Sequence, residues 1–186
     1  TRIAFASTRN GGGPEIFLMD ADGANVMWIN QGFEPAWSTD GAWLAYATDF
    51  GIQVHEIASM ASYTATSDPS DRSPRWFTNY GFRVAFARTR DVGGSLESDL
   101  FEVDMSSLQA PLESPLVEQP GDDLEPVFIE SLFGSQFAYA TQDGDLGNDV
   151  GIHAEGPGIF DRASPGRNPS WSPDGTQVVY DDGGSL

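Results

Sequence analysis

The sequence contains no cysteine and no lysine, and it has only two histidines. Without cysteine the chain can form no disulfide framework, no thiolate nucleophile and no zinc ribbon. The nucleophile-elbow pattern Gly-x-Ser-x-Gly is missing as well. Because these catalytic constellations are absent, we expect a non-enzymatic protein with no catalytic residue and no bound organic cofactor.

Positive charge is scarce, and long apolar runs are missing. Nine arginines are the only basic residues against 28 acidic ones, which gives a formal net charge of −19 at pH 7. Nucleic acid is not expected as a partner, because phosphate binding needs a basic surface. The acidity can serve solubility, which is the simpler interpretation, or it can recruit a basic partner or cations. No segment reaches the 18 or more apolar residues of a membrane span, and no signal-peptide pattern follows Thr1.

What the chain has instead is glycine, proline and short apolar segments. Its 186 residues include 21 glycines and 12 prolines, and 12% of them are aromatic. Runs of Val, Ile, Phe, Tyr and Trp between turn residues are typical of β-strands, and this length suits one domain. We therefore predict a single all-β domain over residues 1–186.

One short strand pattern recurs along the chain: a polar residue or tryptophan, an aliphatic or aromatic residue, a small residue, then Phe or Tyr. The copies lie at 2–6, 43–47, 83–87, 136–140 and 177–180. Three of the four intervals are close to 41 residues and one is longer. A fixed period of this length is typical of propellers and solenoids. The longer interval indicates an insertion at 91–97 and 106–123, with Arg88 and Arg90 expected to anchor its base.

Proline, one further residue and an aromatic residue precede four of these copies, starting at Pro35, Pro74, Pro126 and Pro169. Two of the connecting segments, Thr39-Asp40-Gly41 and Pro173-Asp174-Gly175, are tight-turn sequences, because glycine accepts the positive φ that other residues resist. Each unit is therefore predicted to open with a hairpin.

Further strands are predicted after each hairpin. A third strand is expected at 15–20, 52–57, 99–104 and 150–153, and a fourth at 26–29, 62–66 and 116–118. Four short strands per unit are what a propeller blade requires. The predicted fold is a β-propeller of four-stranded antiparallel blades, with units 1–33 plus 168–186, 34–72, 73–124 and 125–167. We expect four blades, with 169–171 closing the ring onto the N-terminal unit; the alternative is an excerpt of a larger propeller.

The segments 171–175 (Trp-Ser-Pro-Asp-Gly) and 15–25 resemble the TolB-type WD40-like propeller repeat. The resemblance covers essentially the whole chain and departs after Trp76 and Phe128, where other residues replace the Ser-Pro-Asp-Gly turn. It implies an extracytoplasmic protein, in the periplasm or at the cell surface. Such a protein would be a scaffolding or accessory subunit that docks on a larger envelope or membrane complex.

Two other functional classes stay open. Similar repeats form the propeller domain of prolyl-oligopeptidase-like or tricorn-like serine peptidases, whose catalytic domain would lie outside this sequence. A propeller enzyme with carboxylates around its channel is a third class, for which the sequence cannot select a pair. The insertion at 91–97 and 106–123 is either a partner-binding loop or a tolerated insertion without a role.

Two groups of residues could hold a metal ion. Asp143, Asp145 and Asp149 could supply oxygen ligands to calcium, although their segment does not match the twelve-residue calcium loop, and a solvated loop is the simpler expectation. His55 and His153 occupy the same position of the predicted third strand, so a shared metal is conceivable. Solvent-exposed histidines are the simpler expectation.

Overall fold

The computed structural model describes residues 1–77, 81–117, 122–131, 134–143, 147–154, 160–165, 167–172 and 177–181, and side chains for 1–77, 81–117, 138–140, 168–172 and 177–181. All regular secondary structure in these ranges is β-strand. No helix in the described part is long and apolar enough to cross a membrane.

The strands form antiparallel sheets in which sequence neighbours pair with each other. The first sheet contains β1 (Arg2–Ser7), β2 (Glu15–Asp20) and β3 (Met27–Gln31). The second contains β4 (Phe33–Trp37), β5 (Trp43–Thr48), β6 (Gly51–Glu56) and β7 (Ala61–Thr64). The third contains β8 (Arg72–Trp76), β9 (Arg83–Val92), β10 (Ser95–Asp104) and β11 (Leu112–Val117). The fourth contains β12 (Asp122–Ser131), β13 (Gly134–Asp143), β14 (Gly147–Ala154) and β15 (Phe160–Pro165), and a two-stranded sheet contains β16 (Arg167–Trp171) and β17 (Val178–Asp181).

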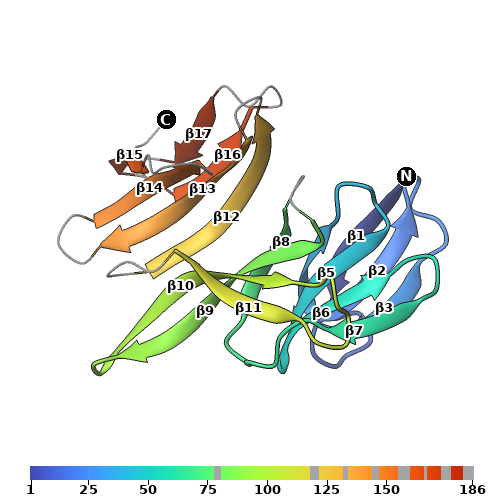
Figure 1. Cartoon of the computed structure of the whole chain (residues 1–186). Helices are drawn as coiled ribbons and strands as arrows, with labels where there is room; N and C mark the ends of the chain where they lie inside the picture. Colours follow the sequence, from blue (N-terminus) through green and yellow to red (C-terminus); the bar gives the residue numbers. More distant parts are fainter. Residues whose placement is uncertain are drawn as a thin grey trace.

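The sheets are stacked in chain order, as propeller blades are (Figure 1). Strand β4 packs against β8, β8 against β12, and β12 against β16, while β1 of the three-stranded sheet packs against β4. The first strand of each later sheet thus lies beside the first strand of the next. The prediction of an all-β chain with four-stranded antiparallel sheets is confirmed.

The hydrophobic core lies between the sheets, because successive side chains of a strand point to opposite faces. On β5, Leu44 and Tyr46 pack against Ile16 and Leu18 of the first sheet. The alternate β5 residues Ala45 and Ala47 belong to the core shared with the third sheet, where Val84, Phe86 and Trp76 lie. A strand that is buried on both faces needs a continuous apolar run, which explains the repeated strand pattern.

No strand pairing among the described residues closes the expected ring. Residues 169–171 belong to β16, which pairs with β17 in a sheet of its own and packs against β12 and β13. Strands β17 and β1 are copies of the same repeat strand and compete for β16. The short hairpin through Ser172 and Gln177 requires less loop-closure entropy than a pairing across the whole chain. The described strands therefore form stacked sheets without the predicted closure, and the number of blades stays a prediction.

The expected insertion loop is also partly regular structure. Its first part extends β9 and β10 into paired strands of ten residues each. Gly93 and Gly94, with φ of 65° and 96°, form the two-residue turn between them. Part of the second segment forms β11, the fourth strand of its sheet.

A distortion recurs in the first strand of several sheets. The residue before the proline has a left-handed backbone at Glu34, Ser73 and Asn168, with φ of 54°, 53° and 51°. The strand pairing shifts register at the same places. A residue before proline is ordinarily extended. Because the same unusual backbone and register shift recur in three sheets, the bulge is a feature of the repeat.

Candidate functional site

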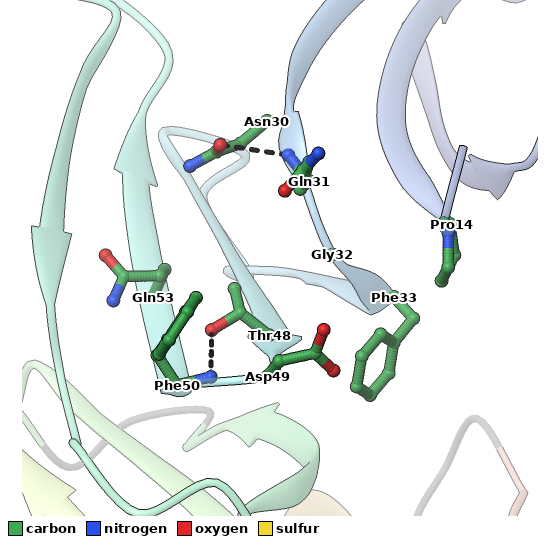
Figure 2. Close-up of a pocket in the computed structure, with 10 residues that line it drawn as sticks. Pro14, Asn30, Gln31, Gly32, Phe33, Thr48, Asp49, Phe50 and Gln53 are labelled. Atoms are coloured by element: carbon green, nitrogen blue, oxygen red, sulfur yellow. Dashed lines mark hydrogen bonds between the residues drawn. The ribbon is translucent and has the colours of Figure 1, made fainter. Parts of the chain in front are cut away.

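A cavity of about 320 Å³ opens between the first and second sheets (Figure 2). Three segments line it: the approach to β2, the link between β3 and β4, and the turn between β5 and β6 with the start of β6. The residues are Gly13, Pro14, Asn30, Gln31, Gly32, Phe33, Thr48, Asp49, Phe50 and Gln53. We call this cavity the first-interface pocket.

The floor of the pocket depends on a single-residue link, Gly32, between β3 and β4. Its N–H donates a hydrogen bond of 2.9 Å to the carbonyl of Pro14. A Cβ atom at this position would lie 2.7 Å from the Ala47 carbonyl oxygen and 2.8 Å from the Tyr46 ring, and φ is +153°. Only glycine allows the chain to pass this close to β5.

The turn between β5 and β6 presents Asp49 and Phe50 at the pocket. The Phe50 N–H donates to the Thr48 hydroxyl over 3.0 Å, and that hydroxyl donates to the Gly51 carbonyl over 2.8 Å. Thr48 is buried, whereas the Phe50 residue is 78% exposed. The turn is thus held from inside while its aromatic ring points to solvent.

The polar side chains of the pocket differ in whether they have hydrogen-bond partners within the protein. The Asn30 amide donates to the Tyr46 hydroxyl over 3.1 Å and accepts from the Gln31 N–H over 2.9 Å. The Gln53 amide donates to the Thr64 hydroxyl over 3.2 Å. The Asp49 carboxylate makes no hydrogen bond or ion pair with any residue that the structure describes. Asp49 is therefore the charged group of the pocket that is available to a ligand.

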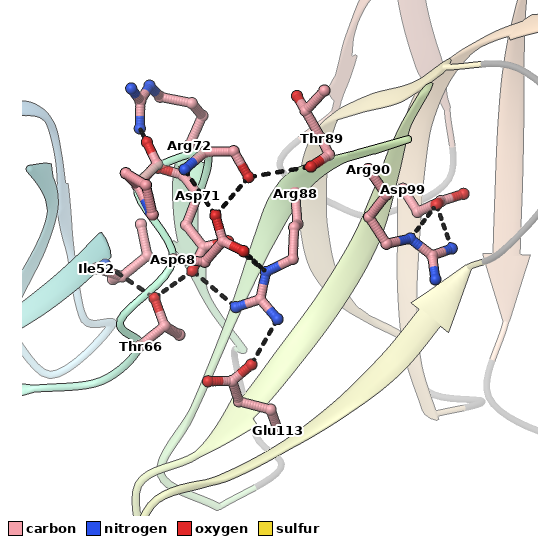
Figure 3. A network of polar contacts seen from close by, with 12 residues as sticks. Ile52, Thr66, Asp68, Asp71, Arg72, Arg88, Thr89, Arg90, Asp99 and Glu113 are labelled. Atoms are coloured by element: carbon pink, nitrogen blue, oxygen red, sulfur yellow. Dashed lines mark hydrogen bonds and ion pairs between the residues drawn. The ribbon is translucent and has the colours of Figure 1, made fainter. Parts of the chain in front are cut away.

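The next interface, between the second and third sheets, holds a polar network in the corresponding place (Figure 3). Arg88 donates two hydrogen bonds to the Asp71 carboxylate, over 2.6 and 2.8 Å, and lies 2.7 Å from Glu113. The Thr66 hydroxyl donates to Asp71 and accepts from the Ile52 N–H over 2.9 Å. This network connects the second sheet to the third.

The environment of Asp71 sets the charge state of this network. Asp71 is completely buried. Burial raises the pKa of its carboxyl, while the hydrogen bonds from Arg88 and Thr66 act in the opposite direction. The hydrogen bond with Asp71 raises the pKa of Arg88, which stays charged. The Arg88 guanidinium also lies over the rings of Phe86 and Phe101, at 5.1 and 5.2 Å from their centroids.

Strand register shows that the two interfaces are equivalent. Phe33 pairs with Ala47 as Arg72 pairs with Ala87, and both pairings are followed by the same shift. The residue before each first partner therefore corresponds, Gly32 to Asp71. The residue after each second partner corresponds in the same way, Thr48 to Arg88. The first-interface pocket occupies the place that the Arg88–Asp71 pair fills in the next interface.

Of the predicted metal ligands, only His55 has a described side chain. Asp145 and the side chains of Asp143, Asp149 and His153 lie outside the described residues, so the calcium site stays a prediction. Among the residues that are described, no group of three or more His, Asp or Glu side chains could hold a metal.

The expectation of an exposed His55 is wrong. His55 is 3% exposed, and its Nδ1 lies 2.9 Å from the Ser62 hydroxyl, while Nε2 has no partner. Strand β6 lies between β5 and β7, so Leu44 and Ser62 flank the ring in register. Burial lowers its pKa.

The pocket itself was missed from the sequence. In the structure one residue joins β3 to β4, whereas seven residues join β7 to β8. The strands predicted at 26–29 and from Pro35 leave five residues between them, so the sequence did not show the short link. The longer link supplies Thr66, Asp68 and Asp71 to the second interface, and the short link leaves the first interface open. Of the two arginines predicted to anchor the insertion, Arg88 pairs with Glu113 of its second segment as well as with Asp71. Arg90 pairs with Asp99.

No family model matches the chain, and no curated protein matches it. A solved structure assigned as TolB from Agrobacterium tumefaciens superposes with a TM-score of 0.70 at 17% identity, covering 96% of this chain and 70% of that one. A Pyrococcus horikoshii acylaminoacyl peptidase superposes with a TM-score of 0.58 at 11% identity, covering 98% of this chain and 36% of that one.

An α-L-arabinofuranosidase from Lactobacillus brevis superposes with a TM-score of 0.50 at 13% identity, over 80% of this chain and 53% of that chain. This chain therefore spans about a third of the peptidase and about half of the arabinofuranosidase. Identities this low establish a common fold and nothing about activity. The chain has the fold of part of a TolB-like β-propeller.

Proposed function

We propose that the chain is a non-enzymatic protein-interaction module that binds a partner through the first-interface pocket. The observation that carries this proposal is the unpaired Asp49 carboxylate beside the exposed Phe50 ring, both held on a turn that is fixed by Thr48. Aromatic anchors on rigid scaffolds are typical of binding hot spots, because little side-chain entropy is lost when they are covered.

The composition of the pocket favours binding over catalysis. Asp49 is the one ionisable side chain among the described lining residues, whose other polar side chains are amides and the Thr48 hydroxyl. General acid–base or nucleophilic catalysis requires a second group to exchange a proton or to activate a nucleophile. A volume of about 320 Å³ is near the lower limit of ligand sites, about 300 Å³, which suits a side chain of a partner rather than a large cofactor.

The wider role follows the sequence resemblance and the TolB-like fold. We propose an accessory subunit outside the cytoplasm, in the periplasm or at the cell surface, that docks on an envelope or membrane complex. An acidic surface with a net charge of −19 supports association with a basic partner, because the long-range field accelerates encounter.

Site-specific photocrosslinking in the native host tests this proposal. A photoreactive phenylalanine analogue replaces Phe50, and in a control it replaces Met60, which is 45% exposed at the opposite end of the second sheet. The proposal expects a protein adduct at position 50 that is absent at position 60. Equal adducts at both positions, or none at either, contradict it.

The structural likeness to acylaminoacyl peptidases favours a second candidate, the propeller domain of a serine peptidase. A fluorophosphonate probe, which labels activated serines, decides between the two candidates when it is applied to the native protein isolated from its host. A labelled polypeptide that contains this chain would establish the peptidase. An unlabelled native protein supports the interaction module.

A further inference from the structure

The chain repeatedly places an arginine over a phenylalanine ring beside a carboxylate. Arg88 lies over Phe86 and pairs with Asp71, and Arg83 lies 4.6 Å from the Phe77 centroid and 2.9 Å from Glu102. A guanidinium is stabilised there by the negative face of the ring and by charge-assisted hydrogen bonds. This combination is the means by which the protein accommodates its own basic side chains.

The first-interface pocket has the same ingredients, but no arginine is among the described residues that line it. Thr48 stands where the next interface has Arg88, and Gly32 stands where it has Asp71. Both residues are smaller than their counterparts, so the space remains open. A carboxylate is still present, because Asp49 supplies it from the neighbouring turn.

The aromatic rings complete the site. In the view of Figure 2 the Asp49 side chain lies between those of Phe50 and Phe33. The Arg72 guanidinium already lies 4.8 Å from the Phe33 centroid, which shows that this ring accepts a cation. Phe50 is 78% exposed and has no such partner among the described residues.

We infer that the first-interface pocket receives an arginine side chain of the partner protein, with its guanidinium paired to Asp49 and stacked on Phe50. The inference rests on the proposed function and names the chemistry that the partner must offer. Arginine is preferred to lysine because its planar guanidinium can stack on a ring and hydrogen-bond in the same plane, which a compact ammonium cannot do. The Gln31 amide adds a hydrogen-bond acceptor among the lining residues.

NMR titration with short peptides tests the inference. The probe is acetyl-Gly-Arg-Gly-amide, and the matched peptides carry lysine or citrulline, the neutral analogue of arginine. We expect the arginine peptide to shift the backbone amides at 30–33 and 48–53, and the citrulline peptide to bind about tenfold or more weakly. Asp49→Asn should weaken arginine binding by a similar factor, and Phe50→Ala by about two- to fivefold.

Asp22→Asn is the control for net charge, because it also removes one negative charge from an exposed turn and keeps the oxygen that accepts the Ala24 N–H. It should leave the affinity unchanged. Equal binding of the citrulline peptide, equal binding of the lysine peptide, or an Asp49→Asn variant that binds like the wild type would overturn the inference. Tighter binding of methyl α-glucoside than of the arginine peptide would also overturn the inference, because it would identify the pocket as a sugar site.

The two proposals fail in different ways. An adduct at position 50 together with no specific arginine binding leaves the interaction module in place and removes the arginine ligand. Specific arginine binding that is lost in Asp49→Asn supports the inference. The absence of any adduct at position 50 in the host contradicts the proposed function whatever the peptides do.

Discussion

Arg88 illustrates how one side chain can join two sheets. Its guanidinium pairs with Asp71, which has no exposed surface, and with Glu113, whose side chain is 34% exposed. Removing one member of a buried pair leaves the other charge without compensation in a low dielectric, whereas an exposed pair is screened by water. The two carboxylates are therefore unequal contributors to stability.

This inequality gives the first prediction. Asp71→Ala should lower the free energy of unfolding by about 3–5 kcal/mol. Glu113→Gln, which alters the second partner of the same guanidinium, should cost about 1 kcal/mol or less. Urea unfolding of both variants measures the difference. A loss of similar size in the two variants would show that burial of Asp71 is not the source of its contribution.

His55 gives a pH-dependent prediction. Burial lowers its pKa in the folded state below the ordinary value of 6.5. The unfolded chain therefore binds a proton at a higher pH than the folded chain does, and the free energy of unfolding falls as the pH is lowered from about 6.5 towards the folded-state pKa. Above about pH 7 both states are neutral at His55, and its contribution to the pH dependence disappears.

The measurement compares urea unfolding of the wild type and His55→Gln between pH 7.5 and 5.0. The glutamine variant lacks the titration, so the difference between the two proteins isolates His55 from the many carboxylates. We expect the wild type to lose stability relative to the variant on acidification. Parallel pH profiles would mean that His55 does not titrate differently on folding.

At the scale of elements, the repeat made most strands predictable. The copies of the first and second strands, such as those containing Trp37 and Leu44, lie in β-strands as expected. The reason is physical: a strand that is buried on both faces needs a continuous apolar run, and a hairpin needs its glycine. The bulges at Glu34 and Ser73 were not predictable, because a residue before proline ordinarily avoids a left-handed backbone.

The pocket was unpredictable for a different reason. It arises from what the first interface lacks, namely a long link and the pair of Arg88 and Asp71, and a missing group becomes visible only after strand register aligns the two interfaces. His55 was misjudged because the predicted third strand does not show which of its residues neighbouring sheets cover. Burial between blades is a property of sheet stacking rather than of the strand.

The short link also yields an element-scale prediction. Gly32→Ala would place a Cβ atom 2.7 Å from the Ala47 carbonyl oxygen and 2.8 Å from the Tyr46 ring. Relief of this overlap requires β4 to move away from β5, at a cost of about 1–3 kcal/mol. Gly12→Ala, where no atom lies within 4 Å of the new Cβ, should change stability by about 0.5 kcal/mol or less. Thermal unfolding of the two variants makes the comparison, and equal midpoints would contradict the close approach.

At the scale of the whole molecule, the sequence predicted the blade type better than the ring. The hairpin through Ser172 is a local feature, and the pattern that marks it formed β16 and β17. Closure depends instead on which of two equivalent strands, β1 or β17, pairs with β16. Because β1 and β17 share one strand pattern, their residues do not show which of them pairs with β16. The shorter loop favours β17, the neighbour in sequence.

Net charge leads to the last prediction. With 28 acidic against nine basic residues, like charges repel one another over the folded surface at pH 7. Unfolding relieves this repulsion by separating the charges, and salt weakens it, since the screening length falls from about 30 Å at 0.01 M to about 8 Å at 0.15 M ionic strength. The midpoint of thermal unfolding should therefore rise between 10 mM and 0.5 M NaCl at pH 7, and each 2–4 °C corresponds to about 1 kcal/mol for a chain of this length. Near pH 4.1, where the net charge vanishes, the rise should disappear, and an equal rise at both pH values would show that salt acts through surface exclusion instead of charge screening.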